Sequence, residues 1–249
     1  MRSIRPLFVF LILFGVAIRI GAQEEEDPTV DLRFLFLDEK LGEGYSVEVN
    51  DDFQKVGSYP YAISSPVSVP PRARLNVYKD LSRPEEAPPP ARGEEPDSHR
   101  VKIATVTAPE NTEAVLVVLR PSPGSQLYQM AYYNSDPRAF PEGTVRVINL
   151  GREPIGVALG GEVKRFAPGD SGVLRPKPDH KHRVITKVMV QNGNGWKNLY
   201  DSLIVMESDD RVTGIVLYSP GGMRHTLTAL EIAEFGEPEP RHAWRMYKD

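Results

Sequence analysis

The run Ala114-Val115-Leu116-Val117-Val118-Leu119 is apolar on both faces of an extended strand. A strand of this kind must be covered on each side, so we expect a central strand between two layers. Residues 72–78 have a different pattern, with Ala73, Leu75 and Val77 on one face and polar or amphipathic side chains on the other. This alternation is typical of a half-buried strand. The two patterns together predict stacked β-layers.

Similar short runs of β-branched and aromatic residues, bounded by turn formers, recur along the chain, and helical periodicity is nearly absent. We expect strands at residues 32–37, 45–50, 73–79, 101–107, 114–119 and 127–133, and then at 144–150, 155–159, 163–166, 172–174, 184–191, 196–206, 211–218 and 225–230. In the second half, pairs such as Gly160-Gly161 and Asn192-Gly193 favour tight turns and predict a meander of hairpins. The expected fold class is all-β, with two antiparallel β-sandwich-like domains.

The expected organisation has four parts. Residues 1–22 are predicted to be a signal peptide, 29–134 an N-terminal sandwich-like domain, 143–235 a C-terminal one, and 236–249 a tail. The turn formers of residues 134–143 mark the boundary between the two domains. Residues 82–99 contain five prolines, five acids and almost no large apolar side chain, which predicts a disordered insertion in the first domain. No sequence repeat relates the halves.

The first residues predict export. Arg2 and Arg5 precede the apolar run of residues 7–18, and Ala22 supplies a small residue at a cleavage point. Because a bilayer core requires about 20 apolar residues, this run is too short for a membrane anchor, and we expect no stable membrane insertion after cleavage. The protein is therefore predicted to be periplasmic or extracellular, in a bacterium.

Composition excludes several classes of site. The 249 residues include no cysteine, so the chain has no disulfides, thiol nucleophile or cysteine-ligated metal. Removing residues 1–22 takes away three arginines and no acids, which changes the net charge from −4 to −7. Neither a basic run nor a cluster of aromatics and arginines is present, so we expect no nucleic-acid partner. No cofactor is implied.

The string Gly169-Asp170-Ser171-Gly172 resembles the nucleophile segment of chymotrypsin-type serine proteases. That family places a histidine before the serine, and the one histidine preceding Ser171 is His99, at the end of the proline-rich insertion. Val173-Leu174 replaces the family's following Gly-Pro. The alternative is a reverse turn at residues 168–170 that Ser171 caps.

Asp179, His180 and His182 are weak candidates for metal ligands. In an extended segment His180 and His182 would point to the same face and could share one ion with Asp179. Lys181 and Arg183 place positive charge in the same segment, which opposes a dication. A solvated basic turn is the alternative, and it leaves the protein without a metal.

Aromatic residues offer candidate binding positions. Tyr59, Tyr61 and Tyr133 can stack sugar rings or dock a peptide if they share an exposed face, and core packing is the alternative. In residues 127–133 we expect Tyr133 to lie opposite a half-buried stripe. In the tail, Trp244 and Tyr247 follow a Glu-Pro-Glu-Pro spacer and can anchor a partner, or fold back over the molecule's own sheet edge.

The order Phe140-Pro141-Glu142-Gly143, then a strand ending Asn149-Leu150, then Gly160-Gly161 and Pro168-Gly169, resembles a group of uncharacterised exported bacterial β-sandwich proteins. The segment from Tyr59 to Tyr78 resembles their N-terminal half. The resemblance implies an exported β-protein and brings no activity, substrate or site residue with it.

These observations favour an exported, non-enzymatic component of the bacterial envelope that is structural or binds another envelope or extracellular protein. The first alternative is a carbohydrate-binding module that uses surface tyrosines. The second is a serine hydrolase around Ser171. The sequence does not define the oligomeric state.

Overall fold

The computed structural model describes residues 28–37, 44–57, 63–81, 100–219 and 241–248. In these ranges the protein is all-β, with sixteen strands in four sheets of four strands each. No helix long and apolar enough to cross a membrane occurs in the described part of the chain. The first eight strands are β1 (Val30–Phe36), β2 (Gly44–Val49), β3 (Asp52–Gly57), β4 (Val67–Val69), β5 (Arg74–Asp80), β6 (Arg100–Thr107), β7 (Ala114–Pro121) and β8 (Tyr128–Asn134).

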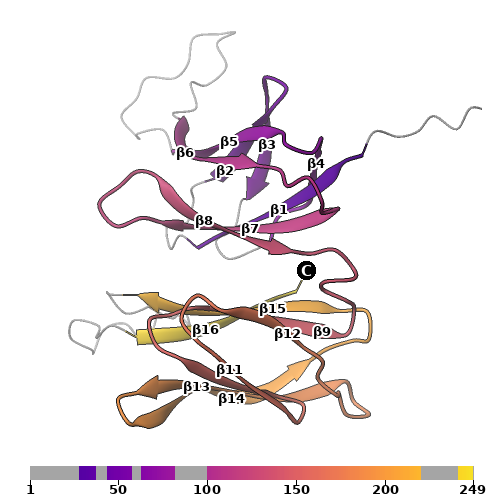
Figure 1. Ribbon diagram of the computed structural model, residues 1–249, viewed down its shortest axis with the longest axis vertical. Coiled ribbons are helices and arrows are strands. Elements are labelled where there is room, and N and C mark those ends of the chain that lie inside the picture. The colour runs from indigo at the N-terminus through magenta and orange to yellow at the C-terminus, as the bar shows by residue number, and fades with distance from the viewer. Residues whose placement is uncertain (1–27, 38–43, 58–62, 82–99, 220–240, 249) are drawn as a thin grey trace, which may run out of the picture.

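The other eight strands follow a linker of nine residues, 135–143. They are β9 (Thr144–Leu150), β10 (Ile155–Leu159), β11 (Glu162–Phe166), β12 (Ser171–Leu174), β13 (Arg183–Asn192), β14 (Gly195–Val205), β15 (Arg211–Ser219) and β16 (Arg241–Lys248). Figure 1 shows the two groups of strands as two separate bodies, indigo to magenta above and orange to yellow below.

The two groups are sandwiches of the same topology. The first consists of sheet A, with strand order β4-β1-β7-β8, and sheet B, β3-β2-β5-β6. The second consists of sheet C, β12-β9-β15-β16, and sheet D, β11-β10-β13-β14. Strands β9 to β16 of the second sandwich correspond in order to strands β1 to β8 of the first. The two halves therefore share a strand topology, although no sequence repeat relates them.

Two expectations about strand pairing are corrected by this topology. Each inner sheet contains one parallel pair, β1 with β7 and β9 with β15, within otherwise antiparallel sandwiches. The second half is therefore not a meander of hairpins. Hairpins connect β10 to β11 and β13 to β14, but β9 pairs with β15, far along the chain, because the connection between them passes through sheet D.

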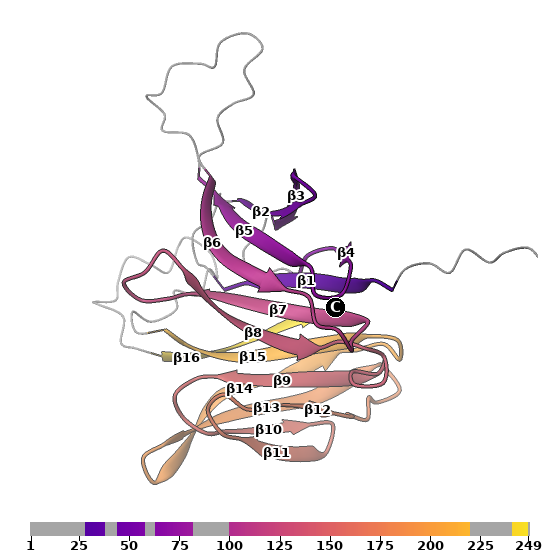
Figure 2. The ribbon, with the colours of Figure 1, turned by 45° about the horizontal axis from the view of Figure 1, so that its top comes forward.

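The sandwiches stack through their inner sheets, so the layer order is B, A, C, D (Figures 1 and 2). Alternate residues of each inner strand face opposite layers. Val115 and Val117 of β7 belong to the first core, whereas Leu116 of β7 packs with Ile148 and Ile215 of sheet C. The expectation that residues 114–119 form a central strand covered on both sides is confirmed. The apolar layer between sheets A and C joins the two sandwiches.

Arginines of the second sandwich hold the linker. Arg146 is buried, and its Nη2 donates hydrogen bonds of 3.0 Å to the Asn134 carbonyl oxygen and to Ser135 Oγ. Its guanidinium carbon lies 4.0 Å from the centroid of the Phe140 ring. Arg211 Nη1 donates to the Ser135 carbonyl oxygen at 3.4 Å. The linker is thus fixed to sheet C as well as covalently joined to both sandwiches.

Three strands differ from the expected set. β3 is mostly exposed and polar, and β4 alternates buried and exposed residues but is only three residues long, too short to be recognised from sequence. β16 lies in the expected tail and pairs with β15 from Val212↔Lys248 to Ser219↔Arg241. The C-terminal sandwich therefore does not end at residue 235. The predicted signal peptide, the insertion 82–99 and the strand 225–230 lie outside the described residues.

Candidate functional site

The outer face of sheet D carries several exposed large hydrophobic side chains. Alternate residues of β13 and β14, such as Val184 and Ile204, are buried in the second core. The residues between them point away from the core, into solvent. At one end of the sheet they are aliphatic and 50–75% exposed: Val163, Ile185, Leu203 and Val205. We call these four residues the aliphatic patch.

Strand register makes three members of the aliphatic patch contiguous. Ile185 of β13 lies directly opposite Leu203 of β14, and Val205 follows Leu203 on the same face. Val163 lies on the edge strand β11, opposite Ala158 of β10. Large apolar side chains on one face of a sheet, without a covering layer, are characteristic of interaction surfaces.

The other end of the same face carries Trp196, which is 46% exposed. Its Cζ3 atom would lie 3.5 Å from a β-carbon built on Gly156. Arg165 lies beside the ring, with its guanidinium carbon 5.5 Å from the ring centroid. An ion pair of 3.3 Å between Lys187 and Asp201 lies between this end and the pair Ile185 and Leu203, in the same cross-strand row as Val163. The face thus has an aromatic end and an aliphatic end.

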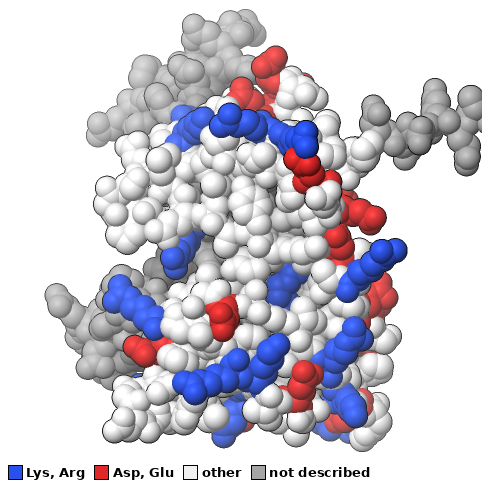
Figure 3. Space-filling model, viewed as in Figure 1, with Lys and Arg blue, Asp and Glu red and all other residues white. Residues whose placement is uncertain are grey.

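The strands of sheet D also carry a net positive charge. Its four strands contain five Lys or Arg residues and two Asp or Glu residues, in a chain whose net charge is −4. Figure 3 shows blue side chains outnumbering red ones over the lower sandwich in that view. An excess of positive charge on this scale attracts acidic groups and speeds their association.

The outer face of sheet B, in the equivalent position of the first sandwich, is covered by polar contacts. Glu48 Oε2 accepts hydrogen bonds from Asn76 Nδ2 at 2.9 Å and from the Tyr78 hydroxyl at 2.8 Å. Both bonds lower the pKa of Glu48, that from Asn76 more strongly. Phe53 is 42% exposed, and the Arg100 guanidinium carbon lies 4.0 Å from its ring centroid. The polar side chains Glu48, Asn76 and Tyr78 of this face are thus hydrogen-bonded to one another.

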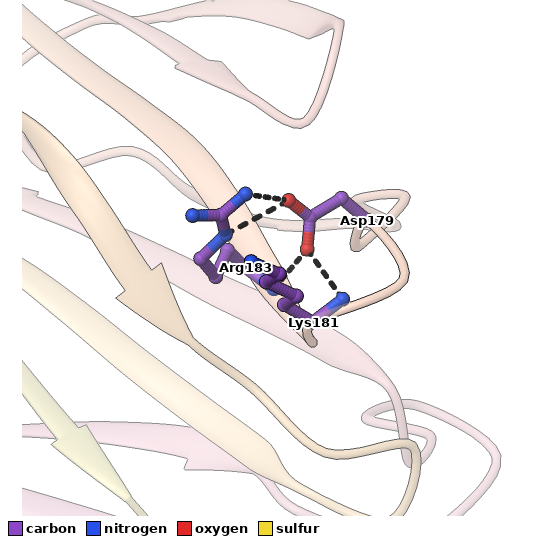
Figure 4. A network of polar contacts seen from close by, with 3 residues as sticks. All are labelled: Asp179, Lys181 and Arg183. Carbon is purple, nitrogen blue, oxygen red and sulfur yellow. Dashed lines mark hydrogen bonds and ion pairs between the residues drawn. The ribbon is translucent and has the colours of Figure 1, made fainter.

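The predicted metal ligands lie in a turn rather than in an extended segment. Asp179 Oδ2 accepts two hydrogen bonds from the Arg183 guanidinium, and Oδ1 accepts the backbone N–H groups of Lys181 and Arg183 (Figure 4). The side-chain bonds from Arg183 hold the pKa of Asp179 well below its ordinary value. The carboxylate therefore serves to shape the turn.

The histidines of this segment are also not brought together as expected. His182 has a positive φ of 57°, so the backbone is not extended, and its Nδ1 lies 2.9 Å from Glu207 Oε2. Among the described residues no three His, Asp or Glu side chains form a group that could hold a metal ion. The expected common face of His180 and His182 is wrong, because the turn rotates the backbone between them.

The segment around Ser171 forms a reverse turn followed by a strand. The Asp170 N–H donates to the Ala167 carbonyl oxygen at 3.0 Å, and the Ala167 N–H donates to Asp170 Oδ2 at 2.9 Å. Asp170, and not Ser171, therefore caps the turn. Ser171 is exposed at the start of β12. His99, the partner that a serine hydrolase would require, lies outside the described residues.

The structure separates the aromatic candidates. Tyr133 is half-buried against the apolar layer between the sandwiches, and burial raises its pKa. The stripe expected on the other face of β8 is half-buried at Tyr128, which packs on the first core, whereas Met130 and Tyr132 are exposed. Tyr59 and Tyr61 lie outside the described residues. The backbones of Trp244 and Tyr247 lie in β16, but their side chains are outside the described part.

Two small cavities lie at the contact between the sandwiches. One, of about 200 Å³, is lined by Asp31, Arg33, Asp209 and Arg211 among others. The other, of about 110 Å³, lies between Val118 and Leu150. Sites for small-molecule ligands usually enclose at least ~300 Å³. Neither cavity matches a substrate pocket.

The sequence matches no known family model and no curated protein. The resemblance of residues 140–169 to exported bacterial β-proteins therefore stays a prediction. The functional argument depends on the surface itself, in particular on the outer face of sheet D. Sequence reasoning missed this face, although Ile185 and Met189, apolar residues on the odd-numbered side of β13, were a readable signal.

Proposed function

We propose that the protein is an exported, non-catalytic component of the bacterial envelope and that the aliphatic patch of sheet D docks a protein partner. The observation that carries this proposal is the exposure of Val163, Ile185, Leu203 and Val205, each 50–75% exposed, on a single sheet face. The equivalent face of sheet B bears a polar network instead. The contrast supports a role specific to sheet D.

The nature of the partner follows from the patch and its surroundings. Burying aliphatic side chains contributes about 25 cal/mol for each Å² removed from water, so the partner should present an apolar centre. The positive excess of the sheet D strands suits an acidic rim around that centre. Export is supported by the basic residues and apolar run of residues 1–22, whose composition is typical of a signal peptide.

A non-catalytic role is supported by the hydrogen bonds that two carboxylates near the candidate site residues accept. The Asp170 carboxylate accepts a backbone N–H in its turn, and the Asp179 carboxylate accepts hydrogen bonds from Arg183. Carboxylates used in this way stabilise loops, whereas a general base must be oriented toward a substrate.

The test is affinity capture of the protein lacking residues 1–22 from envelope extract, with the double variant Ile185→Glu/Val205→Glu beside it. The matched control is Lys55→Gln/Thr107→Glu, which makes the same change in net charge on exposed residues of sheet B. Both pairs are exposed, so we expect stabilities within about 0.5 kcal/mol of the parent.

We expect the parent and the control to retain the same partner, and the sheet D variant to lose it. A partner that the sheet D variant retains would show that the aliphatic patch is not the docking surface. The absence of any specific partner from all three captures would contradict the proposed function itself.

A further inference from the structure

Trp196 lies along the surface of sheet D rather than standing away from it. The residue belongs to β14, and the far end of its indole ring, Cζ3 and Cη2, lies over Gly156 of β10. Strand β13 separates these two strands. Adjacent strands are about 4.8 Å apart, so the ring must extend across β13 to reach Gly156. The ring stays 46% exposed, which leaves an aromatic surface open to solvent.

Small or unbranched neighbours make this arrangement possible. A β-carbon on Gly156 would already be in contact with the ring, and it would also lie 3.9 Å from the Met189 methyl carbon. These are ordinary van der Waals distances, so alanine fits at position 156, and a side chain larger than alanine would displace the indole. The Met189 methyl group lies beside position 156 as well. A small residue at position 156 thus allows the indole to lie along the sheet.

Arg165 and Gln191 border the ring. Arg165 lies opposite Gly156 in the register of β10 and β11, and its Nη2 donates a hydrogen bond of 2.6 Å to Gln191 Oε1. Gln191 lies opposite Trp196 on β13. A guanidinium has five N–H donors. The contacts of Arg165 with described residues are the amide of Gln191 and the ring of Trp196, and none of them is a carboxylate.

The chemistry of this end of the face is specific. An exposed aromatic ring stacks on the C–H face of a pyranose, and a guanidinium without a carboxylate partner matches a planar carboxylate in charge and in geometry. A nucleic acid would require several aromatic platforms in succession, and the outer face of sheet D has one. The net positive charge of the sheet D strands adds electrostatic complementarity to an acidic ligand.

We propose that Trp196, Arg165 and Gln191 bind a carboxylated pyranose, that is, a uronic acid unit of an acidic polysaccharide. The sugar ring stacks on Trp196, and the carboxylate accepts N–H groups of Arg165. Gln191 Nε2 donates one N–H to the Gly193 carbonyl oxygen at 3.3 Å, and its second N–H donates to a ring hydroxyl. The site lies beyond the Lys187–Asp201 ion pair from Ile185 and Leu203, and its ligand is a sugar rather than a protein, so it goes beyond the protein-docking role. Sugar stacking here uses a tryptophan, not the tyrosines that the sequence singled out.

The experiment is calorimetric titration of the protein lacking residues 1–22 with oligomers of galacturonate, glucuronate and mannuronate. Each oligomer is paired with its methyl ester, which keeps the ring and removes the negative charge. The variants are Trp196→Ala and Arg165→Gln. The controls are Phe53→Ala, which removes an exposed aromatic ring from sheet B, and Ile185→Ala in the aliphatic patch.

We expect at least one acidic oligomer to bind the parent and both controls, with affinity falling as salt is raised. Trp196→Ala should weaken binding about tenfold or more, and Arg165→Gln should abolish the preference for acid over ester. Lack of binding to all three acids, equal binding of acid and ester by the parent, or unchanged binding by Trp196→Ala would overturn the proposal. None of these results affects capture of a protein by the aliphatic patch, so the two proposals fail separately.

Discussion

The outer sheets B and D hold equivalent places in two sandwiches of the same strand order, yet their solvent faces differ in chemistry. On sheet B, Glu48 is hydrogen-bonded by Asn76 and Tyr78, and the Arg100 guanidinium lies over the partly exposed ring of Phe53. On sheet D, aliphatic side chains are 50–75% exposed. Both sheets cover a hydrophobic core, so the core does not determine the chemistry of the outer face. The two sandwiches share a topology, and their solvent-facing residues differ in what they can bind.

The inner sheets show what happens when such an apolar face is covered. The outward residues of sheet A, such as Leu35 and Leu116, are buried because sheet C lies on them. The aliphatic patch of sheet D is similar in composition to this face of sheet A, but no described layer covers it. Sheets A and C are topologically equivalent, so their contact joins the same kind of surface from each sandwich, as in an isologous dimer.

Removing residues 241–249 should have the largest effect. The deletion takes away β16, leaves β15 unpaired along one edge and exposes the core against which Met246 packs. We expect the second sandwich to lose its cooperative thermal transition by calorimetry, whereas removal of Asp249 alone should not change it. A stable truncated protein that only loses a partner would instead support the tail as an interaction peptide.

Leu116→Ala and Val205→Ala compare a covered face with an open one. Leu116 is buried between the sandwiches, so its truncation should lower the free energy of unfolding by about 2–4 kcal/mol. Val205 is 70% exposed, and its truncation should change that free energy by less than about 0.5 kcal/mol. Urea denaturation measures both values. Equal losses would mean that Val205 is covered in the isolated protein.

The smallest effects should appear in acid. The native pKa values of Glu48 and Asp179 are lowered by hydrogen bonds, from Asn76 and Arg183 respectively. Their contribution to stability is present above the unfolded-state pKa values, near 4, and is lost as pH falls toward the native values.

Glu48→Gln and Asp179→Asn should therefore lower Tm by a small amount at pH 7, and the gap from the parent should close below about pH 4. Thermal scans between pH 7 and pH 2.5 test this. A gap that stays constant over that range would show that the charge of neither carboxylate is involved.

Much of the fold was predictable because a strand with one buried face has alternating apolar and polar residues in its sequence. The fold class and the two-sided burial of residues 114–119 follow directly from apolar pattern. The parallel pairs do not, because β1 and β7 are paired by backbone hydrogen bonds between segments that are distant in sequence. The apolar pattern of a strand does not specify which strand pairs with it. β16 was missed as a strand because it lies beyond a turn-forming Glu-Pro-Glu-Pro stretch.

The Trp196 site was hidden by a β-bulge. Residues 196 and 204 are eight positions apart, so regular alternation of side chains would place both on the same face of β14. The register shifts between Val188 and Met189 of β13, which leaves Leu199 as an extra residue on β14. Ile204 is therefore buried while Trp196 points outward. A bulge changes which residues face solvent, and the sequence shows no local mark of it.

Binding at sheet D is tested most directly by hydroxyl-radical footprinting of the protein in its native envelope fraction and after purification. We expect Ile185, Leu203 and Trp196 of sheet D to be protected from oxidation in the envelope and oxidised once purified, whereas Phe53 of sheet B should be oxidised equally in both. Equal oxidation of the sheet D residues in the two samples would contradict the claim that sheet D is the binding face.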